Sequence, residues 1–249
     1  MSENEPVKPK KGWGYLHWSV LLTVLVLMAG LASSIVSHFL VKRDQMRAAS
    51  DLSLLLNLMR SYASEFDGHY PDFAGQNLSN GKDLPKRTSN SAFRRLIQVG
   101  MIQDERVLGC SYSRFNPDGN IGNDPDHAEA LTPGENHWMM VAGLSDRSPG
   151  HYPLILENAV DASWPPKWLP SPFLLSRWFA NLRGELPPRG RSWPSNTILI
   201  GFNDGSIKTV QLELKDGFLH LPESILKPEG KEPLPTLKIL DIELPEIRQ

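Results

Sequence analysis

Residues 16–41 read LHWSVLLTVLVLMAGLASSIVSHFLV, and residues 42–66 continue as KRDQMRAASDLSLLLNLMRSYASEF. The first run contains no Asp, Glu, Lys or Arg. A helix needs roughly 20 apolar residues to cross the hydrocarbon core of a bilayer, whereas the apolar core of a cleaved signal peptide spans only about 7–15 residues. We therefore expect residues 16–41 to form an uncleaved, single-pass transmembrane helix, with the membrane as a partner.

The second run predicts an amphipathic continuation of the same helix. Its apolar residues recur at spacings of three and four, which puts them on one helical face: Leu52, Leu55, Leu56, Met59, Tyr62 and Phe66. Gly68 supplies a stop signal and Pro71 follows it. The pattern predicts one helix of about 50 residues, whose second half covers a protein core.

The remaining chain favours short strands separated by turns. Alternating apolar residues predict strands at 137–144 and 152–157, and the strongest hairpin signal joins 197–202 to 206–214 through Asn203-Asp204-Gly205. Asp-Gly favours a tight hairpin turn in which both central residues adopt positive φ. Short helices are expected at 91–97 and 173–182, and a short strand within 101–110. Together these elements predict an α+β fold with a long helix packed on an antiparallel sheet.

Composition limits the organisation and the classes of function. The predicted segments are a tail at 1–15, the transmembrane helix at 16–41, a globular domain at 42–221 and a Pro-rich extended tail at 222–249. The chain has a formal net charge of −2, so no excess of positive charge indicates nucleic-acid binding. Cys110 is the only cysteine, which excludes a disulfide within the chain.

Several short motifs occur in an order that is informative as a whole. The helix ends in YASEFDGHYP at 62–71, Ala92-Phe93-Arg94 follows, Gly143-Leu144-Ser145 comes later, and Phe202-Asn203-Asp204-Gly205-Ser206 closes the series. In this order the chain resembles the pseudopilins of type II secretion, which are pilin-like proteins with a prepilin-type N-terminal segment. The resemblance covers most of residues 16–212.

The resemblance implies a pilin-like fold and a position in the cell. Positive charges flank the apolar run almost equally, so charge alone does not orient it. The resemblance places residues 1–15 in the cytoplasm and the globular domain on the periplasmic side of a bacterial inner membrane. It also implies other pilin-like or secretion-system subunits as partners. Lys11-Gly12-Trp13 is the one candidate processing site, and its fifth mature position is His17 where the family has Glu, so we expect no prepilin-type cleavage.

An oxygen-rich stretch in the long loop at 116–136 is a calcium candidate. Its side chains alternate in the way that calcium ligands do, and the candidate ligands are Asn116, Asp118, Asn120, Asp124 and Asp126. The EF-hand pattern fails because its sixth and twelfth positions are Ile121 and His127 instead of Gly and Glu. Asn, Asp and Gly also favour plain turns, and this second interpretation is the stronger one.

The sequence contains no recognisable catalytic motif. The histidines lack the spacing of a zinc site, no serine lies in GxSxG, and no phosphate loop or dinucleotide fingerprint occurs. We therefore expect a non-enzymatic structural protein without a cofactor or small-molecule substrate. The alternative is an anchored extracytoplasmic binding module that uses the Trp/Pro-rich segment, with tryptophans at 164, 168, 178 and 193. An anchored hydrolase is a third option that no motif supports.

Overall fold

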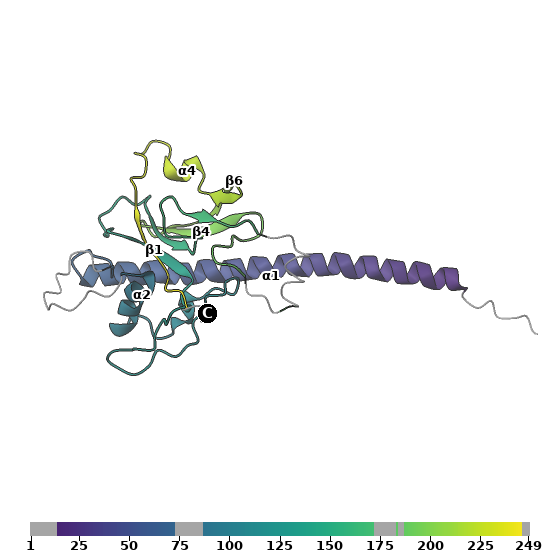
Figure 1. The fold of residues 1–249 in the computed structure, drawn as a ribbon, viewed down its shortest axis with the longest axis horizontal. Coiled ribbons are helices and arrows are strands. Elements are labelled where there is room, and N and C mark those ends of the chain that lie inside the picture. The colour runs from purple at the N-terminus through teal and green to yellow at the C-terminus, as the bar shows by residue number, and fades with distance from the viewer. Residues whose placement is uncertain (1–13, 73–86, 172–182, 184–186, 246–249) are drawn as a thin grey trace, which may run out of the picture. The chain divides into compact units, whose positions relative to one another are not determined.

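The computed structural model describes residues 14–72, 87–171, 183 and 187–245. The chain divides into two compact units, Met1–Arg43 and Asp44–Gln249. Helix α1 (Tyr15–Glu65), labelled in Figure 1, contributes residues to both units, and each unit is described by itself below. The expected helix at 173–182, most of the predicted tail at 1–15 and the Lys11-Gly12-Trp13 site lie outside the described residues.

The described part of the first unit is the N-terminal portion of α1. Its large apolar side chains are exposed, and they include Trp18, Val20, Leu21, Leu22, Val24, Leu25, Val26, Leu27, Met28, Ile35, Val36, Phe39 and Leu40. Among the residues that the structure describes, no helix is both long and apolar enough to cross a membrane.

This finding contradicts the predicted transmembrane helix at 16–41. The same finding contradicts the single-pass topology and the expected location, an inner-membrane anchor with the globular domain on the periplasmic side, because both require that helix. The prediction relied on the length of the run and its absence of charge, which together are a weaker criterion than continuous apolar character over a full span. The run is interrupted by small and polar residues such as Ser19, Thr23 and Gly30.

The second unit is built on a five-stranded antiparallel sheet with the order β5-β4-β2-β1-β8. Its strands are β1 (Trp138–Ala142), β2 (Pro153–Glu157), β4 (Thr197–Phe202), β5 (Ile207–Gln211) and β8 (Lys238–Leu240). The central strands are buried along almost their whole length. The strands predicted at 137–144, 152–157 and 197–202 are confirmed, and the predicted Pro-rich tail contributes β8 to this sheet.

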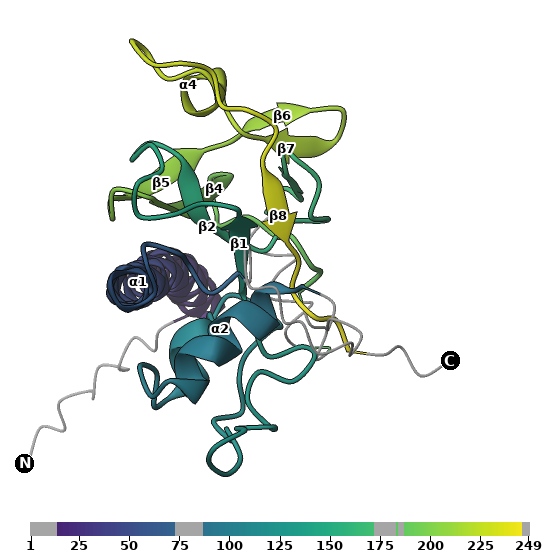
Figure 2. The same ribbon diagram turned by 90° about the vertical axis from the view of Figure 1, so that its left-hand side faces the viewer.

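A second, three-stranded antiparallel sheet has the order β3-β7-β6. Its strands are β3 (Lys167–Trp168), β6 (Glu213–Lys215) and β7 (Phe218–His220), and the short helix α4 (Glu223–Leu226) follows them. Figure 2 shows this small sheet and α4 on one side of the five-stranded sheet, with α2 on the other.

Helix α2 (Ser89–Gln98) begins at a capping box. The Thr88 side chain accepts a hydrogen bond from the Ser91 backbone N–H at 3.0 Å, and the Ser91 side chain accepts one from the Thr88 N–H, also at 3.0 Å. These two contacts satisfy donors that a helix start leaves unpaired. Residues 101–110, where a strand was expected, instead contain the 3-10 helix η1 (Glu105–Leu108), which begins at the Asp104 cap.

The second half of α1 presents its predicted apolar face to the interior. Five of the six predicted residues are buried, while Phe66 is half-buried and stacks on Tyr62 with ring centroids 4.1 Å apart. A Cβ atom at Gly201 of β4 would lie 2.9 Å from Cδ1 of Leu56 and 3.2 Å from Cδ1 of Leu52. The α+β class with an N-terminal helix and an antiparallel sheet is therefore confirmed.

The hairpin between β4 and β5 turns at Asp204 and Gly205. Gly205 has φ of 82°, but Asp204 is not among the residues with positive φ. The Phe202 N–H donates to Ser206 O at 2.8 Å, and the Gly205 N–H donates to Phe202 O at 2.9 Å. The predicted hairpin is confirmed, whereas the expectation of positive φ at both turn residues is wrong, because one extra residue is accommodated in the loop.

Candidate functional site

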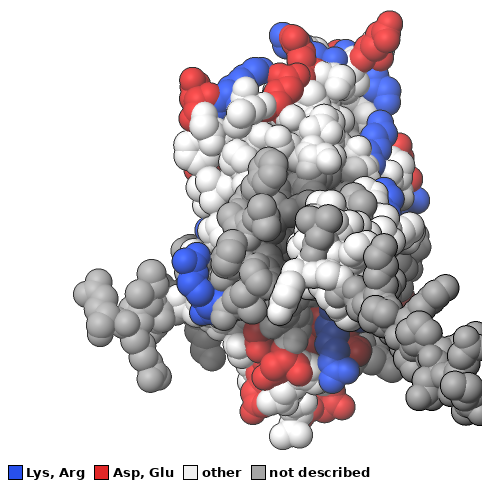
Figure 3. Space-filling model, turned by 90° about the vertical axis from the view of Figure 1, so that its right-hand side faces the viewer, with Lys and Arg blue, Asp and Glu red and all other residues white. Residues whose placement is uncertain are grey.

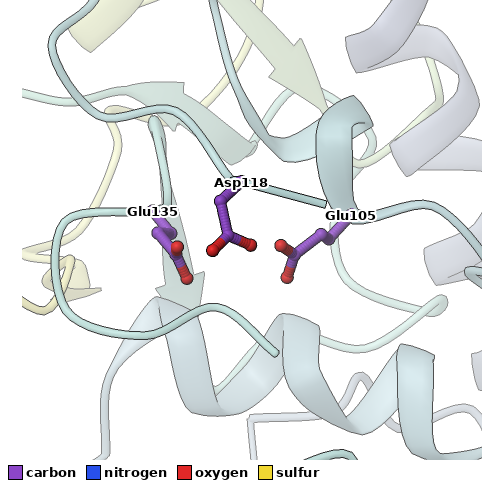
Figure 4. A group of neighbouring side chains, drawn as sticks. All are labelled: Glu105, Asp118 and Glu135. Atoms are coloured by element: carbon purple, nitrogen blue, oxygen red, sulfur yellow. The ribbon is translucent and has the colours of Figure 1, made fainter. Parts of the chain in front are cut away.

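Three carboxylates gather at one place in the second unit. Glu105 comes from η1, Asp118 from the following loop and Glu135 from the segment before β1, and one oxygen of each lies within 4.8 Å of the others. Figure 4 shows the three side chains pointing toward one another from separate segments. We call these residues the carboxylate cluster. It is the one group of this kind among the described residues.

Glu105 is the buried member of the cluster. Its two oxygens accept hydrogen bonds from the Gly119 N–H and the Leu131 N–H, each at 2.9 Å. Burial is the main cause that raises the pKa of Glu105, the two backbone donors oppose it, and the charges of Glu135 and Asp118 add to it. The side chain therefore joins two loop segments through a single buried carboxyl group.

The other two members satisfy local backbone donors. Asp118 Oδ1 accepts from the Asn120 N–H at 2.7 Å. Glu135 Oε2 accepts from the Thr132 N–H at 2.6 Å and from the Thr132 hydroxyl at 2.8 Å. Carboxylate oxygens are the ligands that calcium prefers, but calcium takes six to eight of them. The cluster supplies three carboxyl groups whose oxygens already accept protein hydrogen bonds.

Of the five predicted calcium ligands, Asp118 belongs to the cluster. Asn116 accepts from the Cys110 N–H at 2.8 Å, Asn120 donates to Glu129, and Asp124 pairs with His127 at 2.8 Å. Asp126 accepts from Gln98 only through its backbone oxygen among the bonds described. Sequence reasoning missed Glu105 and Glu135 because they lie outside the oxygen-rich stretch and no spacing pattern connects them to it.

A pocket of about 210 Å³ opens beside the second half of α1. Its lining includes two acidic and two basic side chains, a thiol and a short loop: Asp44, Arg47, Ala48, Asp51, Arg106, Gly109, Cys110, Ser111, Asn116 and Pro117. Burial raises the pKa of Asp51, and the Arg47 charge opposes that shift. Burial also raises the pKa of the Cys110 thiol, which makes it a poor nucleophile near neutral pH.

The motif residues that carry the resemblance meet in one hydrogen-bonded junction. The Tyr70 hydroxyl donates to Asn203 Oδ1 at 2.8 Å, and the Asn203 amide donates to Ser145 O at 3.0 Å and Ser148 O at 2.7 Å. The Arg60 guanidinium of α1 donates to the Asn203 backbone oxygen at 3.2 Å. We call this set the Tyr70–Asn203 junction. It joins the end of α1, the β1–β2 connection and the β4–β5 hairpin.

No family model, no curated protein and no solved structure matches this chain. The function must therefore be argued from the residues of the chain itself. The face drawn in Figure 3 carries Lys and Arg interspersed with Asp and Glu, without a large area of either sign.

The tryptophans of the alternative binding surface are mostly in the interior. Trp168 and Trp193 are buried and Trp164 is half-buried, while Trp178 lies outside the described residues. Trp193 stacks on Tyr112, with ring centroids 4.6 Å apart. Their burial gives Trp168 and Trp193 a packing role, as is usual for large aromatic side chains.

Proposed function

We propose that the chain is a non-enzymatic structural subunit, pseudopilin-like, of a type II secretion or pilus-like assembly. The observation that carries this proposal is the row of exposed apolar side chains on the N-terminal portion of α1. Monomeric soluble proteins rarely expose contiguous apolar surface of more than a few hundred Å², and larger patches mark interaction sites. The partner that fits such an apolar helix surface is another apolar helix, as in subunits that assemble side by side.

Two features of the second unit support the pilin-like part of the proposal. Leu52 and Leu56 of α1 pack against Gly201 of the antiparallel sheet. The motif residues Tyr70, Ser145 and Asn203, which are distant in the sequence, form one junction. A structural subunit needs a rigid joint between its helix and its sheet, and buried, fully satisfied polar networks give that rigidity.

A photocrosslinking experiment tests the proposal. A photoreactive residue replaces Leu22, which is 64% exposed, and the matched control places it at Leu214, which is 61% exposed in the second unit. In the purified full-length chain, we expect irradiation at position 22 to produce adducts between copies that map to residues 15–43. An absence of adducts from position 22, or equal yields from both positions, would contradict the proposal.

A further inference from the structure

Glu157 is an acidic residue placed inside the hydrophobic core. It is the last residue of β2, and only 2% of its surface is exposed. Its Oε1 accepts a hydrogen bond from the Trp193 indole N–H at 2.5 Å, and the Leu199 backbone N–H is a second donor. No ion pair joins Glu157 to a Lys, Arg or His among the described residues. A buried carboxylate without a cation is costly, so such groups favour the neutral form.

The strand register places Glu157 on the sheet face that α1 contacts. Ile155 pairs with Gly201, against which Leu56 packs, and Ile155 and Glu157 share one face of β2 because side chains alternate along a strand. On the same face of β4, Thr197 accepts a hydrogen bond from Gln45 of α1 at 3.4 Å. Glu157 therefore lies within the contact between α1 and the sheet.

The charged and titratable groups of the pocket come from α1, from η1 and from the segment after η1. Asp44, Arg47 and Asp51 of α1 line the pocket, together with Arg106 and Cys110. Burial is the largest cause that raises the pKa of Cys110, and the charge of Glu157 is the second. The charges of Asp44 and Asp51 raise this pKa by less. Cys110 thus lines the pocket and is near enough to Glu157 to be affected by its charge. Trp138, Trp193 and Leu199 are neutral neighbours of Glu157.

We propose that Glu157 is a pH-sensitive latch, which holds Trp193 and the α1–sheet contact closed while it is protonated and loosens them when it ionises. Burial raises the pKa of Glu157 to about 8, and the hydrogen bonds from Trp193 and Leu199 oppose that rise. The folded protein therefore keeps this proton in a range where an ordinary glutamate has lost it. Ionisation leaves a charge that only two neutral donors and entering water solvate.

The direction of the pH effect follows from proton linkage. Below the ordinary glutamate pKa of about 4.5, both folded and unfolded chains are protonated and the full stabilisation is present. Between about 4.5 and about 8 the unfolded chain alone is ionised, so rising pH weakens the folding equilibrium by up to about tenfold per pH unit. The weakening ends as pH passes about 8, where the folded chain has ionised as well.

The reactivity of Cys110 reports this opening directly, because it is the only cysteine and is 5% exposed. The rate of labelling by a small thiol reagent is measured from pH 6 to 9.5 in the full chain and normalised to the unfolded chain at each pH. We expect the normalised rate of the wild type to rise by up to about tenfold per pH unit from pH 6 to about pH 8, and to level off above that pH. Glu157→Gln, which stays neutral, should give a flat profile.

A second variant keeps the test decisive if Glu157→Gln fails to fold. Trp193→Phe removes a donor that favours the ionised form, so it should move the opening transition to higher pH. Circular dichroism establishes that each variant is folded. The proposal would be overturned if the wild type and Glu157→Gln gave identical normalised profiles. If only Trp193→Phe folds, a profile identical to that of the wild type would overturn it instead. A flat profile in the wild type would overturn it as well.

Discussion

The Tyr70 hydroxyl donates a hydrogen bond of 2.8 Å to Asn203 Oδ1, and both side chains are buried. This bond connects the segment that leaves α1 with the β4–β5 hairpin. The same Asn203 amide donates to Ser145 O and Ser148 O. One asparagine therefore holds three segments of the chain together, and the loss of any partner leaves a buried polar group unsatisfied.

Tyr70→Phe tests this bond with the ring retained. The variant removes the donor and leaves Asn203 Oδ1 without it in the interior, so we expect the free energy of unfolding to fall by about 1–3 kcal/mol. Denaturant titration of the full chain measures the change. Tyr15→Phe is the matched control, because Tyr15 is 96% exposed, and it should leave the midpoint unchanged. An unchanged midpoint in Tyr70→Phe would mean that the junction contributes nothing to stability.

Leu56→Ala tests the contact between α1 and the sheet. Leu56 is 1% exposed, and truncation of a buried leucine costs about 2–5 kcal/mol because it removes apolar contacts and leaves a cavity. Leu54→Ala, at a position 49% exposed on the same helix, is the control and should cost far less. Thermal unfolding of the two variants compares them. Equal effects would show that this face of α1 does not pack on the core.

A double-mutant cycle identifies the partner of Leu56. A Cβ at Gly201 would lie 2.9 Å from one methyl carbon of Leu56 and 3.0 Å from the other, so Gly201→Ala alone should overpack the site. Leu56→Ala removes these methyl groups and makes room for the new one. We therefore expect the double variant to be more stable than the sum of the single effects predicts. Additive effects would place the two residues out of contact.

Glu105→Gln separates the hydrogen bonds of the carboxylate cluster from its charge. Glu105 uses both oxygens to accept backbone N–H groups, and glutamine offers one oxygen, so we expect a loss of about 1–3 kcal/mol in unfolding free energy. Glu135→Gln removes the same charge, but it keeps one oxygen that can accept both bonds from Thr132. Glu135→Gln should therefore lower the unfolding free energy by less than Glu105→Gln does. The reverse order in a denaturant titration would show that charge repulsion dominates this cluster.

Buried His137 should lower the stability of the protein at acid pH. Burial lowers the pKa of His137 to about 3. The folded chain therefore stays unprotonated at this residue over a pH range in which the unfolded chain, with a pKa of 6.5, binds a proton. Its contribution is fully present above about pH 6.5 and is lost as pH falls toward 3. His137→Asn, which cannot titrate, should flatten the stability profile between those values. Urea midpoints measured from pH 3 to 7 check this, and parallel profiles would contradict it.

The sequence predicts the elements whose pattern is local. The apolar face of α1, the strands around Met140 and Ile155, and the β4–β5 hairpin follow from spacing and turn residues, and the structure contains them. The transmembrane prediction, which rested on the length of residues 16–41 and their absence of charge, failed because that run is not apolar enough over a full span. The 3-10 helix at 105–108 was missed because the Asp104 cap, not apolar periodicity, sets its start.

The candidate sites depend on contacts that no local pattern encodes. Glu105 and Glu135 meet Asp118 only through tertiary folding, and Glu157 reads in the sequence as the polar end of a strand. Its burial follows from the position of Trp193, which reaches it from a distant segment. The oxygen-rich loop gave a calcium candidate because Asn and Asp serve turns and ions through the same atoms. In the structure, Asp118 Oδ1 and Asn120 Oδ1 each accept a hydrogen bond from the backbone N–H two residues further along the chain.

Sedimentation velocity of the full chain tests the proposed assembly most directly. We predict that the wild type sediments as concentration-dependent oligomers and that Leu22→Glu combined with Leu27→Glu sediments as a monomer, because a helix–helix contact would bury the two new charges. Leu214→Glu, at a similarly exposed leucine in the second unit, is the control and should behave as the wild type does. A monomeric wild type at tens of micromolar, or oligomers that persist in the double variant, would contradict the account.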